Sequence, residues 1–322
     1  MGIVERAVEM AQASEKPAPA GSAPEPLQAM PDGTSESLRP KVPEPVDRKS
    51  SPHGASLTAR DLKPIVQLDL VRLRESGRLP PEESARKTEE EVRRIKWPLL
   101  NSIAKRNGAT PVRNNVILVT SALAGEGKTF ISLNLALSIV RDRELRVILV
   151  DGDVARPGLT PALGLADRAG LNDVLENPEL AISAVTYQTD VEGLLVVPAG
   201  KWHDRAPEFF AGSRMPQVIE DLIRRVGNGV VILDSPPLLA TNEAQVATRY
   251  VGQVVLVVRA NETEQRAVKD ALALIDASAS VTAVLNGATP SILGRYYGEY
   301  SYGSGYDDEA QVRRRGRTGG DD

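Results

Sequence analysis

Short apolar runs alternate with helix-period stretches over residues 112–290. The runs fall at residues 116–120, 145–150, 194–198, 229–233, 251–258 and 281–285. Continuous apolar runs of this length are typical of strands that are buried on both faces of a sheet. Because the runs alternate with helical stretches, they predict an α/β fold with a mostly parallel sheet and helices on both faces. The segment is long enough for one hydrophobic core.

Residues 57–110 show the helical period without strand-like runs. Val92, Ile95, Leu99 and Ile103 recur at three or four residues within a highly charged stretch, which predicts an amphipathic helix. A second helix is expected from Asp61, with Pro64 in its first turn, Leu62, Val66, Leu70 and Leu73 on its apolar side and Gly77 past its end. Together these two helices predict a small helical appendage that precedes the sheet.

The two ends of the chain have a different composition. Residues 1–56 are rich in proline, alanine, serine and glutamate, a mixture that buries too little apolar surface to fold, although residues 1–11 could form a short amphipathic helix. Residues 291–322 are rich in glycine and tyrosine and are expected to be a flexible tail. The expected domains are therefore 1–56, 57–110, 111–290 and 291–322.

Composition and charge narrow the function classes. The formal net charge of the 322 residues is −4, with 39 basic and 43 acidic side chains, so the chain has no overall electrostatic case for binding nucleic acid. No apolar stretch approaches the roughly 18 residues needed to cross a bilayer, so we expect a cytoplasmic enzyme with no transmembrane segment of its own. The chain has no cysteine, which excludes thiolate ligation of an iron–sulfur cluster.

The first predicted strand leads directly into a glycine-rich turn that ends in Gly127-Lys128-Thr129. Backbone N–H groups in such a turn, together with the N-terminus of the next helix, form a cradle for phosphate groups. The turn resembles the P-loop pattern G-x-x-x-x-G-K-[ST], in which Lys reaches the phosphates and Ser or Thr holds Mg²⁺. Ala122 stands where that pattern has its first glycine.

Two more predicted strands end in carboxylates. One delivers Asp151 and Asp153, followed by Arg156 and Pro157, and the other delivers Asp234. Ligands of an open parallel sheet bind outside the carboxyl ends of its strands, so these side chains and the phosphate cradle are expected to share one crevice. Carboxylate oxygens there suit Mg²⁺, which keeps several of its waters.

These motifs resemble those of the bacterial tyrosine autokinases that regulate polysaccharide export, of the stand-alone cytoplasmic type similar to the exosortase-associated tyrosine kinases. That family carries a P-loop, a D-x-D strand named Walker A′ and a Walker B strand that ends in Asp, and the similarity runs from Val112 to Asn286. Two positions depart from the family pattern: Ala124 replaces the usual proline of the loop, and Ala155 replaces one of the arginines after D-x-D.

The resemblance implies an ATP-dependent protein tyrosine kinase with ATP and Mg²⁺ as cofactors. Its catalytic residues would be Lys128, Asp151, Asp153, Asp234 and Arg156, and its metal residues Thr129, Asp153 and Asp234. We expect Asp151 to accept the tyrosine proton, although Asp151 and Asp153 could exchange roles. The nucleotide would be held by Ala124, Gly125, Glu126, Gly127, Lys128, Thr129, Phe130 and Asn286, the last contacting adenine.

Five of the seven tyrosines, Tyr296, Tyr297, Tyr300, Tyr302 and Tyr306, lie in the tail. In the resembled family such a cluster is the autophosphorylation substrate, and each phosphate adds nearly two negative charges. The resemblance also implies a ring-shaped homo-oligomer that assembles through a Glu-x-x-Arg-x-x-Arg helix, and a membrane-embedded polysaccharide chain-length protein as activator. This chain reads Glu90-x-x-Arg93-x-x-Lys96, which could equally be a solvated face with pairs such as Glu89 with Arg93.

Two other readings of the sequence remain. The chain could be a nucleotide-gated scaffold in which tyrosine phosphorylation is incidental or absent. It could also be a partitioning-type ATPase, but that class carries a signature lysine early in its loop, and Leu123 occupies the position here. An apolar side chain cannot stabilise phosphate charge. Phosphate on the tail tyrosines of the purified chain would distinguish the kinase from both.

Overall fold

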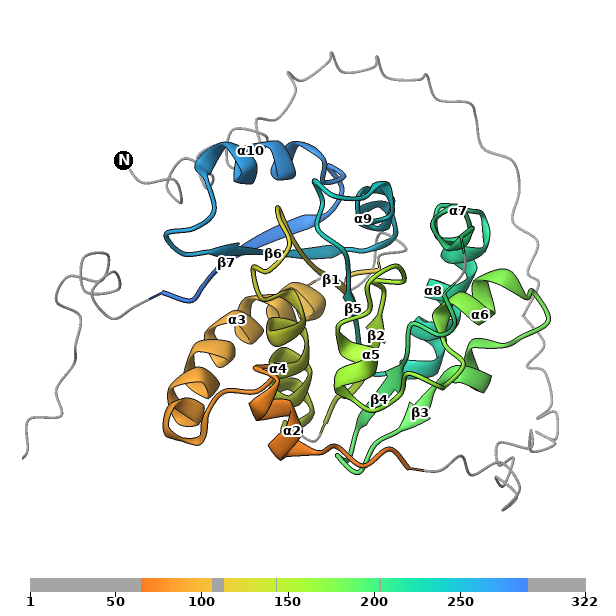
Figure 1. Cartoon of the computed structure of the whole chain (residues 1–322), viewed down its shortest axis with the longest axis horizontal. Helices are drawn as coiled ribbons and strands as arrows, with labels where there is room; N and C mark the ends of the chain where they lie inside the picture. Colours follow the sequence, from red (N-terminus) through yellow and green to blue (C-terminus); the bar gives the residue numbers. More distant parts are fainter. Residues whose placement is uncertain (1–64, 106–112, 143, 203, 289–322) are drawn as a thin grey trace, which may run out of the picture. The chain divides into compact units, whose positions relative to one another are not determined.

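A seven-stranded sheet forms the centre of the fold in a computed structural model of the chain, which describes residues 65–105, 113–142, 144–202 and 204–288 (Figure 1). In spatial order the strands are β3 (Tyr187–Gln188), β4 (Leu194–Val197), β2 (Arg146–Asp151), β5 (Gly229–Asp234), β1 (Val116–Ser121), β6 (Gln253–Arg259) and β7 (Ser280–Asn286). All neighbouring strands pair in parallel except β3 and β4.

Alternate residues of the central strands pack against opposite faces of the sheet. In β1, Ile117 and Val119 belong to one buried cluster, whereas Val116 and Leu118 belong to the other. The first cluster includes α3 (Ala85–Lys105) and α4 (Lys128–Val140), which lie side by side in Figure 1. The second includes α6 (Leu171–Glu176) and α8 (Arg214–Val226). The strands are continuously apolar because both of their faces are buried.

The remaining helices are short. They are α2 (Leu70–Glu75), α5 (Leu159–Ala162), α7 (Ala206–Phe210), α9 (Asn242–Ala247) and α10 (Gln265–Ala273), with 3₁₀ turns η1 (Glu82–Ser84), η2 (Ile182–Val185) and η3 (Thr248–Tyr250). The predicted fold class and all six predicted strands are confirmed within a few residues at each end. Strand β3 was missed because two residues carry no readable period, and its antiparallel pairing of Tyr187 with Val196 is a tertiary contact.

Helix α3 packs its predicted apolar side on the core. Val92 and Leu99 are buried, and Ile95 and Ile103 pack against the same cluster. The resemblance assigned the position of Lys96 to a contact between subunits. In this structure the side chain of Lys96 is buried within the chain. Its Nζ donates to the carbonyl oxygen of Ser138 and to Asp142, each at 3.0 Å, so Lys96 fastens α3 to the end of α4.

The expected helix from Asp61 is wrong at its start. Helix α2 begins at Leu70, where the side chain of Asp69 caps it by accepting a hydrogen bond from the backbone N–H of Arg72 at 3.0 Å. Val66, expected on the apolar side of that helix, instead forms an isolated bridge with Thr189 beside β3. The apolar pattern could not place the start of the helix, because Asp61 and Asp69 each suit a turn or a helix cap. Gly77 does follow the helix, with a φ of 67°.

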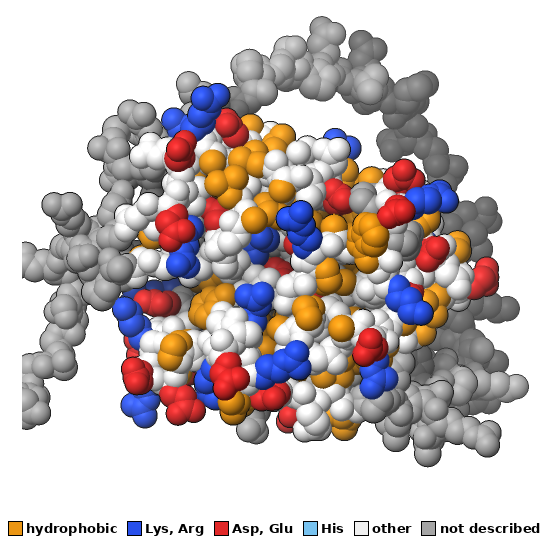
Figure 2. Space-filling model, in the orientation of Figure 1, with side chains coloured by type: hydrophobic (Ala, Val, Ile, Leu, Met, Phe, Trp, Pro, Cys, Tyr) orange, Lys and Arg blue, Asp and Glu red, His pale blue; other side chains and the backbone are white. Residues whose placement is uncertain are grey.

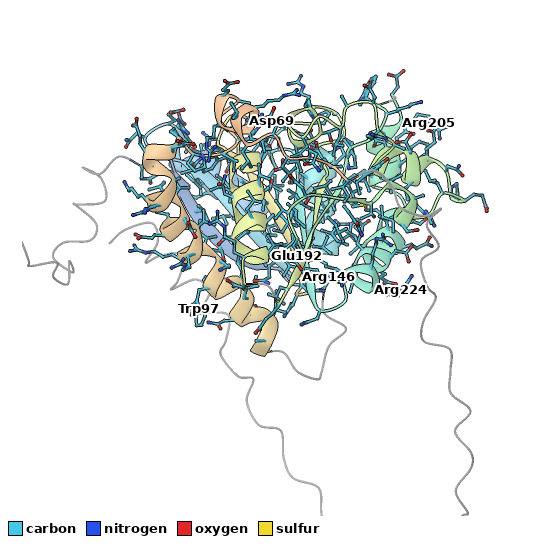
Figure 3. All side chains as sticks on the ribbon, turned by 90° about the horizontal axis from the view of Figure 1, so that it is seen from below. Asp69, Trp97, Arg146, Glu192, Arg205 and Arg224 are labelled. Atoms are coloured by element: carbon cyan, nitrogen blue, oxygen red, sulfur yellow. The ribbon has the colours of Figure 1, made fainter. Side chains whose placement is uncertain are left out.

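The outer surface of α3 is mostly charged. Arg93 pairs with Glu89 at 3.7 Å, which confirms that predicted intrahelical contact, and Trp97 is 68% exposed on the outer side of the helix (Figure 3). Acidic and basic side chains are interspersed on the face drawn in Figure 2. Within the described ranges, no helix combines the length and the apolar character needed to cross a membrane.

Candidate active site

Three adjacent strands bring the predicted site residues together. β5 lies between β2 and β1, and the parallel register sets Asp151 of β2 directly opposite Asp234 of β5. Strand β1 ends at Ser121, immediately before the glycine-rich turn. The backbone N–H of Gly152 donates to the carbonyl oxygen of Asp234 at 2.7 Å, so the loop after β2 is held against the end of β5. The three strand ends that carry the predicted site residues are therefore adjacent, as the sequence predicts.

The turn from Ala122 to Gly127 has the backbone of a phosphate cradle. Gly125 and Gly127 have φ values of 84° and 97°, which L-residues with side chains adopt only at a cost. Gly127 is the N-cap of α4, and Lys128 is the first residue of that helix. The first N–H groups of α4 have no acceptor within the helix, and such groups are available to bind an anion.

Glu126 fastens this loop to the neighbouring strands. Its buried carboxylate accepts hydrogen bonds from the backbone N–H of Leu123 at 2.6 Å and of Arg259 at 3.3 Å, and from the hydroxyl of Thr263. The Asn286 amide donates to the carbonyl oxygen of Glu126 at 2.9 Å. Two residues that were predicted to bind nucleotide, Glu126 and Asn286, thus support the loop from outside in this structure. The contact of Asn286 with adenine stays a prediction.

Replacing Gly127 with alanine is expected to distort this support. An added Cβ would lie 2.0 Å from the amide nitrogen of Asn286, in addition to the cost of the positive φ. We expect Gly127→Ala to reduce the free energy of unfolding by about 2 to 3 kcal/mol. Gly125→Ala is the matched control, because its φ is also positive but no atom lies within 4 Å of the added carbon. Urea unfolding measures both variants, and equal losses would contradict a steric role for Asn286.

Thr129 and Asp234, two of the predicted metal residues, contact one another. The Thr129 hydroxyl donates to Asp234 Oδ2 at 2.7 Å, and the Ser132 hydroxyl donates to Oδ1 at 3.0 Å. Because Asp234 is buried, desolvation raises its pKa to about 6, while the two hydroxyl hydrogen bonds and Lys128 oppose the shift. The carboxylate is thus fixed in orientation and is costly to leave without a positive counterpart.

Lys128 supplies one such positive charge. Its own burial lowers the pKa of its ammonium group, whereas Asp234, Asp153 and Glu126 act in the opposite direction. An ammonium group that is partly out of water attracts a phosphate group more strongly than one in bulk water. The predicted placement of Lys128 beside the carboxylates is consistent with these electrostatic effects.

Asp151 is fully buried and is held by Thr160. The backbone N–H and the hydroxyl of Thr160 donate to Asp151 Oδ2 at 2.6 and 2.7 Å, while the hydroxyl accepts from the N–H of Ala199 at 2.8 Å. Asp151 Oδ1 is buried and has no hydrogen-bond partner among the described residues. Burial first, and the nearby charge of Asp234 second, raise the pKa of Asp151 to about 7.

Asp153 and Arg156 lie at the more open side of the site. Asp153 is partly exposed and its Oδ1 accepts a hydrogen bond from the backbone N–H of Arg156 at 3.0 Å, while the side chain of Arg156 is exposed. Desolvation raises the pKa of Asp153, and the hydrogen bond from Arg156 together with the charge of Lys128 opposes the shift. Asp151 and Asp153 therefore differ sharply in exposure although only one residue separates them.

The residue set fits a nucleotide with Mg²⁺. No group of three or more His, Cys, Asp or Glu side chains able to hold a metal occurs within the described part of the chain. Mg²⁺ in nucleotide sites uses one or two carboxylates, waters and the phosphates themselves, so Thr129, Asp234 and Asp153 are sufficient donors. Gly125 and Gly127 give the loop a backbone conformation that residues with a Cβ adopt only at a cost.

Sequence reasoning missed Ser132 and Thr160, which orient the two buried carboxylates. Neither belongs to a readable motif, because their roles depend on a helical turn and on a loop that folds back on β2. Phe130, a predicted nucleotide contact, packs its side chain against the core cluster under α4. The five tail tyrosines lie outside the described residues.

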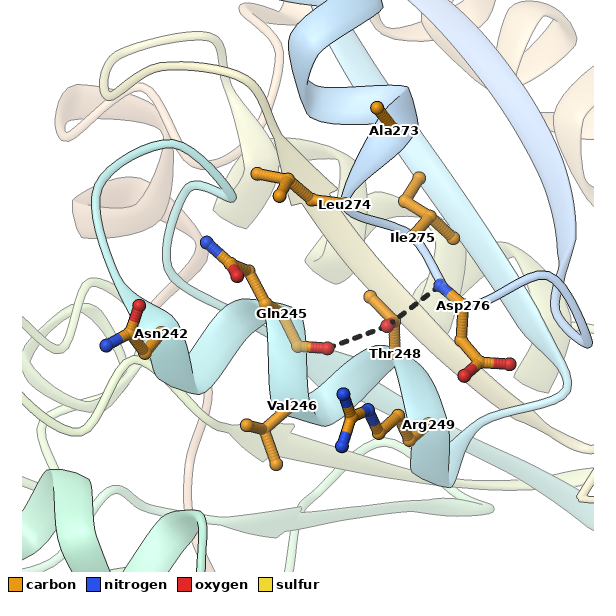
Figure 4. Close-up of a pocket in the computed structure, with 9 residues that line it drawn as sticks. All are labelled: Asn242, Gln245, Val246, Thr248, Arg249, Ala273, Leu274, Ile275 and Asp276. Atoms are coloured by element: carbon orange, nitrogen blue, oxygen red, sulfur yellow. Dashed lines mark hydrogen bonds between the residues drawn. The ribbon is translucent and has the colours of Figure 1, made fainter.

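A pocket of about 460 Å³ lies between α9, η3 and the end of α10 and shares no residue with the cradle (Figure 4). Thr248, one of the lining residues, donates to the carbonyl oxygen of Gln245 at 2.7 Å and accepts from the N–H of Asp276 at 3.1 Å. None of the predicted site residues lines it, so it supports no part of the chemistry expected at the strand ends.

Residues 112–286 match the sequence profile of a family named ParA, described as NUBPL iron-transfer P-loop NTPase. This range coincides with the one over which the sequence motifs extend. The match covers the sheet, the glycine-rich loop and all three aspartates.

The chain is also similar to several proteins that are named as tyrosine kinases. "Tyrosine-protein kinase ptk" of Acinetobacter johnsonii is 29% identical over 154 residues, which is 48% of this chain and 20% of that protein. "Putative tyrosine-protein kinase CapB" of Staphylococcus aureus is 28% identical over 189 residues, 58% of this chain and 80% of that protein. The solved "BceF Tyrosine Kinase Domain" superposes with a TM-score of 0.56 at 25% identity, covering 71% of this chain and 93% of that one. The chain spans about a fifth of the length of the first two curated relatives that it matches.

Proposed function

The chain belongs to the ParA family of P-loop NTPases, and from this premise we propose that it is an ATP-dependent protein tyrosine kinase that phosphorylates its own C-terminal tyrosines. One observation carries the proposal: Lys128, Thr129, Asp151 and Asp234 converge at adjacent strand ends on one phosphate cradle. The similarity to proteins named tyrosine kinases, in sequence and in fold, supports the choice of tyrosine as acceptor.

The residues around the cradle supply what phosphoryl transfer needs, which is positioning and charge stabilisation. The N–H groups from Gly125 to Thr129 and the ammonium group of Lys128 would bind the β- and γ-phosphates of ATP. Thr129, Asp153 and Asp234 would hold Mg²⁺ directly or through water. When bound, Mg²⁺ offsets the negative charge that develops on the phosphate oxygens. Arg156, exposed at the open side, would steady the group in transfer.

A base is needed because the pKa of a free tyrosine is about 10. Asp151 and Asp153 divide the required properties between them. Asp151 has a pKa of about 7, which suits a base at neutral pH, and one oxygen without a partner among the described residues. Asp153 has the greater exposure. We propose Asp151 as the base. Asp153 would lie beside the phosphates, because the positive charge of Lys128 acts on the Asp153 carboxylate.

We also propose a biological role for the chain, in the regulation of polysaccharide synthesis and export. The resemblance to autokinases of polysaccharide export supports a ring of subunits that phosphorylation disassembles, and so times polysaccharide synthesis and export. It also supports a membrane-embedded chain-length protein as activator, with the chain acting at the cytoplasmic side of the inner membrane. The family description also names iron transfer, but the chain has no cysteine to provide thiolate ligands.

Purified chain with Mg·ATP is expected to acquire phosphate on tyrosines between 296 and 306, which peptide mass spectrometry would locate. The control is a variant with phenylalanine at Tyr296, Tyr297, Tyr300, Tyr302 and Tyr306, which keeps the site and removes the acceptors. The same assay is repeated with membranes that contain the chain-length protein. ATP hydrolysis without phosphotyrosine under both conditions would reject the kinase and favour the scaffold or partitioning-type ATPase.

A further inference from the structure

Arg78 belongs to no motif and lies outside the P-loop segment, but hydrogen bonds fix its backbone against α2 and α4. It follows Gly77 at the end of α2, and its N–H donates to the carbonyl oxygen of Leu73 at 2.8 Å. Its own carbonyl oxygen accepts from the side-chain amide of Asn134 on α4 at 3.0 Å. Leu73 and Leu79 are buried on either side of it. The position of Arg78 relative to α4 is therefore set by the core.

The guanidinium group of Arg78 lies at the edge of the cradle. A Cβ built on Gly158, in the loop after β2, would be 2.9 Å from the Thr129 hydroxyl and 3.7 Å from Arg78 Nη2. The same small volume is thus approached by the P-loop threonine, by the loop that carries Asp153 and by Arg78. The positive charge of Arg78 also contributes to lowering the pKa of Lys128, which places the two cations within electrostatic reach.

No acidic side chain in the described part of the chain forms an ion pair with Arg78. Its Nε is buried and has no hydrogen-bond partner among the described residues. The two other arginines of the segment are engaged elsewhere: Arg72 donates to the carbonyl oxygen of Pro161 at 3.1 Å, and Arg74 pairs with Glu82 at 3.5 Å. Since a partly buried cation without a counter-charge costs free energy, the arrangement favours an anion that arrives with the ligand.

We propose that Arg78 binds phosphate oxygens of the nucleotide in the same chain, at the Thr129 side of the cradle. The proposal rests on the nucleotide site of the proposed function and adds a residue from the segment that precedes the P-loop domain. A guanidinium group suits this role because its planar fork can donate two parallel hydrogen bonds to phosphate. Arg78 and Lys128 would then approach the phosphates from two different segments, the turn after α2 and the first turn of α4.

Binding of Mg²⁺ with AMP-PNP, a non-hydrolysable ATP analogue, tests the proposal without any phosphoryl transfer. Calorimetric titration is expected to give a Kd about tenfold higher for Arg78→Gln than for the wild type. Arg78→Lys should give an intermediate Kd, because lysine keeps the charge and lacks the fork. Arg74→Gln is the matched control from the same segment, and its Kd should stay within about twofold of wild type, since its ion pair is at the surface.

Thermal unfolding separates ligand binding from a structural role. Without nucleotide, Arg78→Gln should have a Tm equal to or above that of the wild type, because it removes a cation that lacks a counter-charge. With AMP-PNP the increase in Tm should be smaller than for the wild type. An unchanged Kd in Arg78→Gln would overturn the proposal, whether or not the Tm of the free protein falls.

The two proposals fail in different ways. A wild-type chain that does not bind AMP-PNP would overturn the nucleotide site, and Arg78 with it. A wild-type chain that binds AMP-PNP and forms no phosphotyrosine would overturn the kinase alone, while a higher Kd in Arg78→Gln would still support Arg78 as a phosphate ligand.

Discussion

Phosphorylation of the tail is expected to fall on the order of a thousandfold when Lys128 is replaced with alanine. Lys128 is the first residue of α4, and it lies among Asp234, Asp153 and Glu126 with part of its hydration removed. An ammonium group in such surroundings stabilises phosphate charge far better than one in water. Single-turnover phosphorylation with saturating Mg·ATP, read on the tail peptides, measures the loss.

Lys87→Ala is the control for this loss of positive charge. Lys87 pairs with Glu91 at 3.9 Å on the exposed side of α3, so its removal should leave the rate unchanged. Measuring AMP-PNP affinity in parallel separates ground-state binding from transfer, because a residue that acts mainly on the transition state lowers the rate more than the affinity. Retention of more than about a tenth of the wild-type rate in Lys128→Ala would contradict the assigned role.

Replacing Asp151 with asparagine is expected to make the nucleotide-free protein more stable at pH 8, to give a smaller gain at pH 5, and to leave its stability nearly unchanged only below about pH 4. The pKa of Asp151 is raised to about 7 in the folded protein from an ordinary value of 3.8. Between these values the folded state binds more protons than the unfolded state, so the stability that Asp151 contributes is lost as the pH rises toward and through 7. Asparagine removes that loss, by roughly 2 to 4 kcal/mol at pH 8.

Urea unfolding of the wild type and Asp151→Asn at pH 5, 6, 7 and 8 measures this difference. Asp276→Asn is a control of opposite sign, because hydrogen bonds from Ser278 lower the pKa of Asp276, and it should bring no gain at pH 8. If Asp151 is also the base, Asp151→Asn should lose the pH dependence of transfer near 7 and about a hundredfold in rate. A rate loss in Asp153→Asn that matches this pH behaviour, with Asp151→Asn unaffected, would assign the base to Asp153.

The sequence of this protein determined what depends on local pattern. Continuous apolar runs predicted six strands because residues buried on both faces of a sheet must be apolar at every position. The Gly125-x-Gly127-Lys128-Thr129 spacing predicted the loop because only glycine adopts the required positive φ readily. The grouping of the aspartates at the ends of β2 and β5 followed from the rule that ligands bind at the carboxyl ends of parallel strands.

Tertiary structure alone decided the contacts between segments that are distant along the chain. It buried Lys96 against α4, joined Glu126 to Thr263 and Asn286, and set Thr160 beneath Asp151. It also brought Arg78 to the edge of the cradle beside Gly158. Each contact depends on packing angles and loop paths, and the periodic pattern of a single segment contains no information about either. The adjacency of the strand ends that carry the predicted site residues was therefore readable from the sequence. The electrostatic environment that sets the pKa values of these residues arose only when the fold removed water from between them.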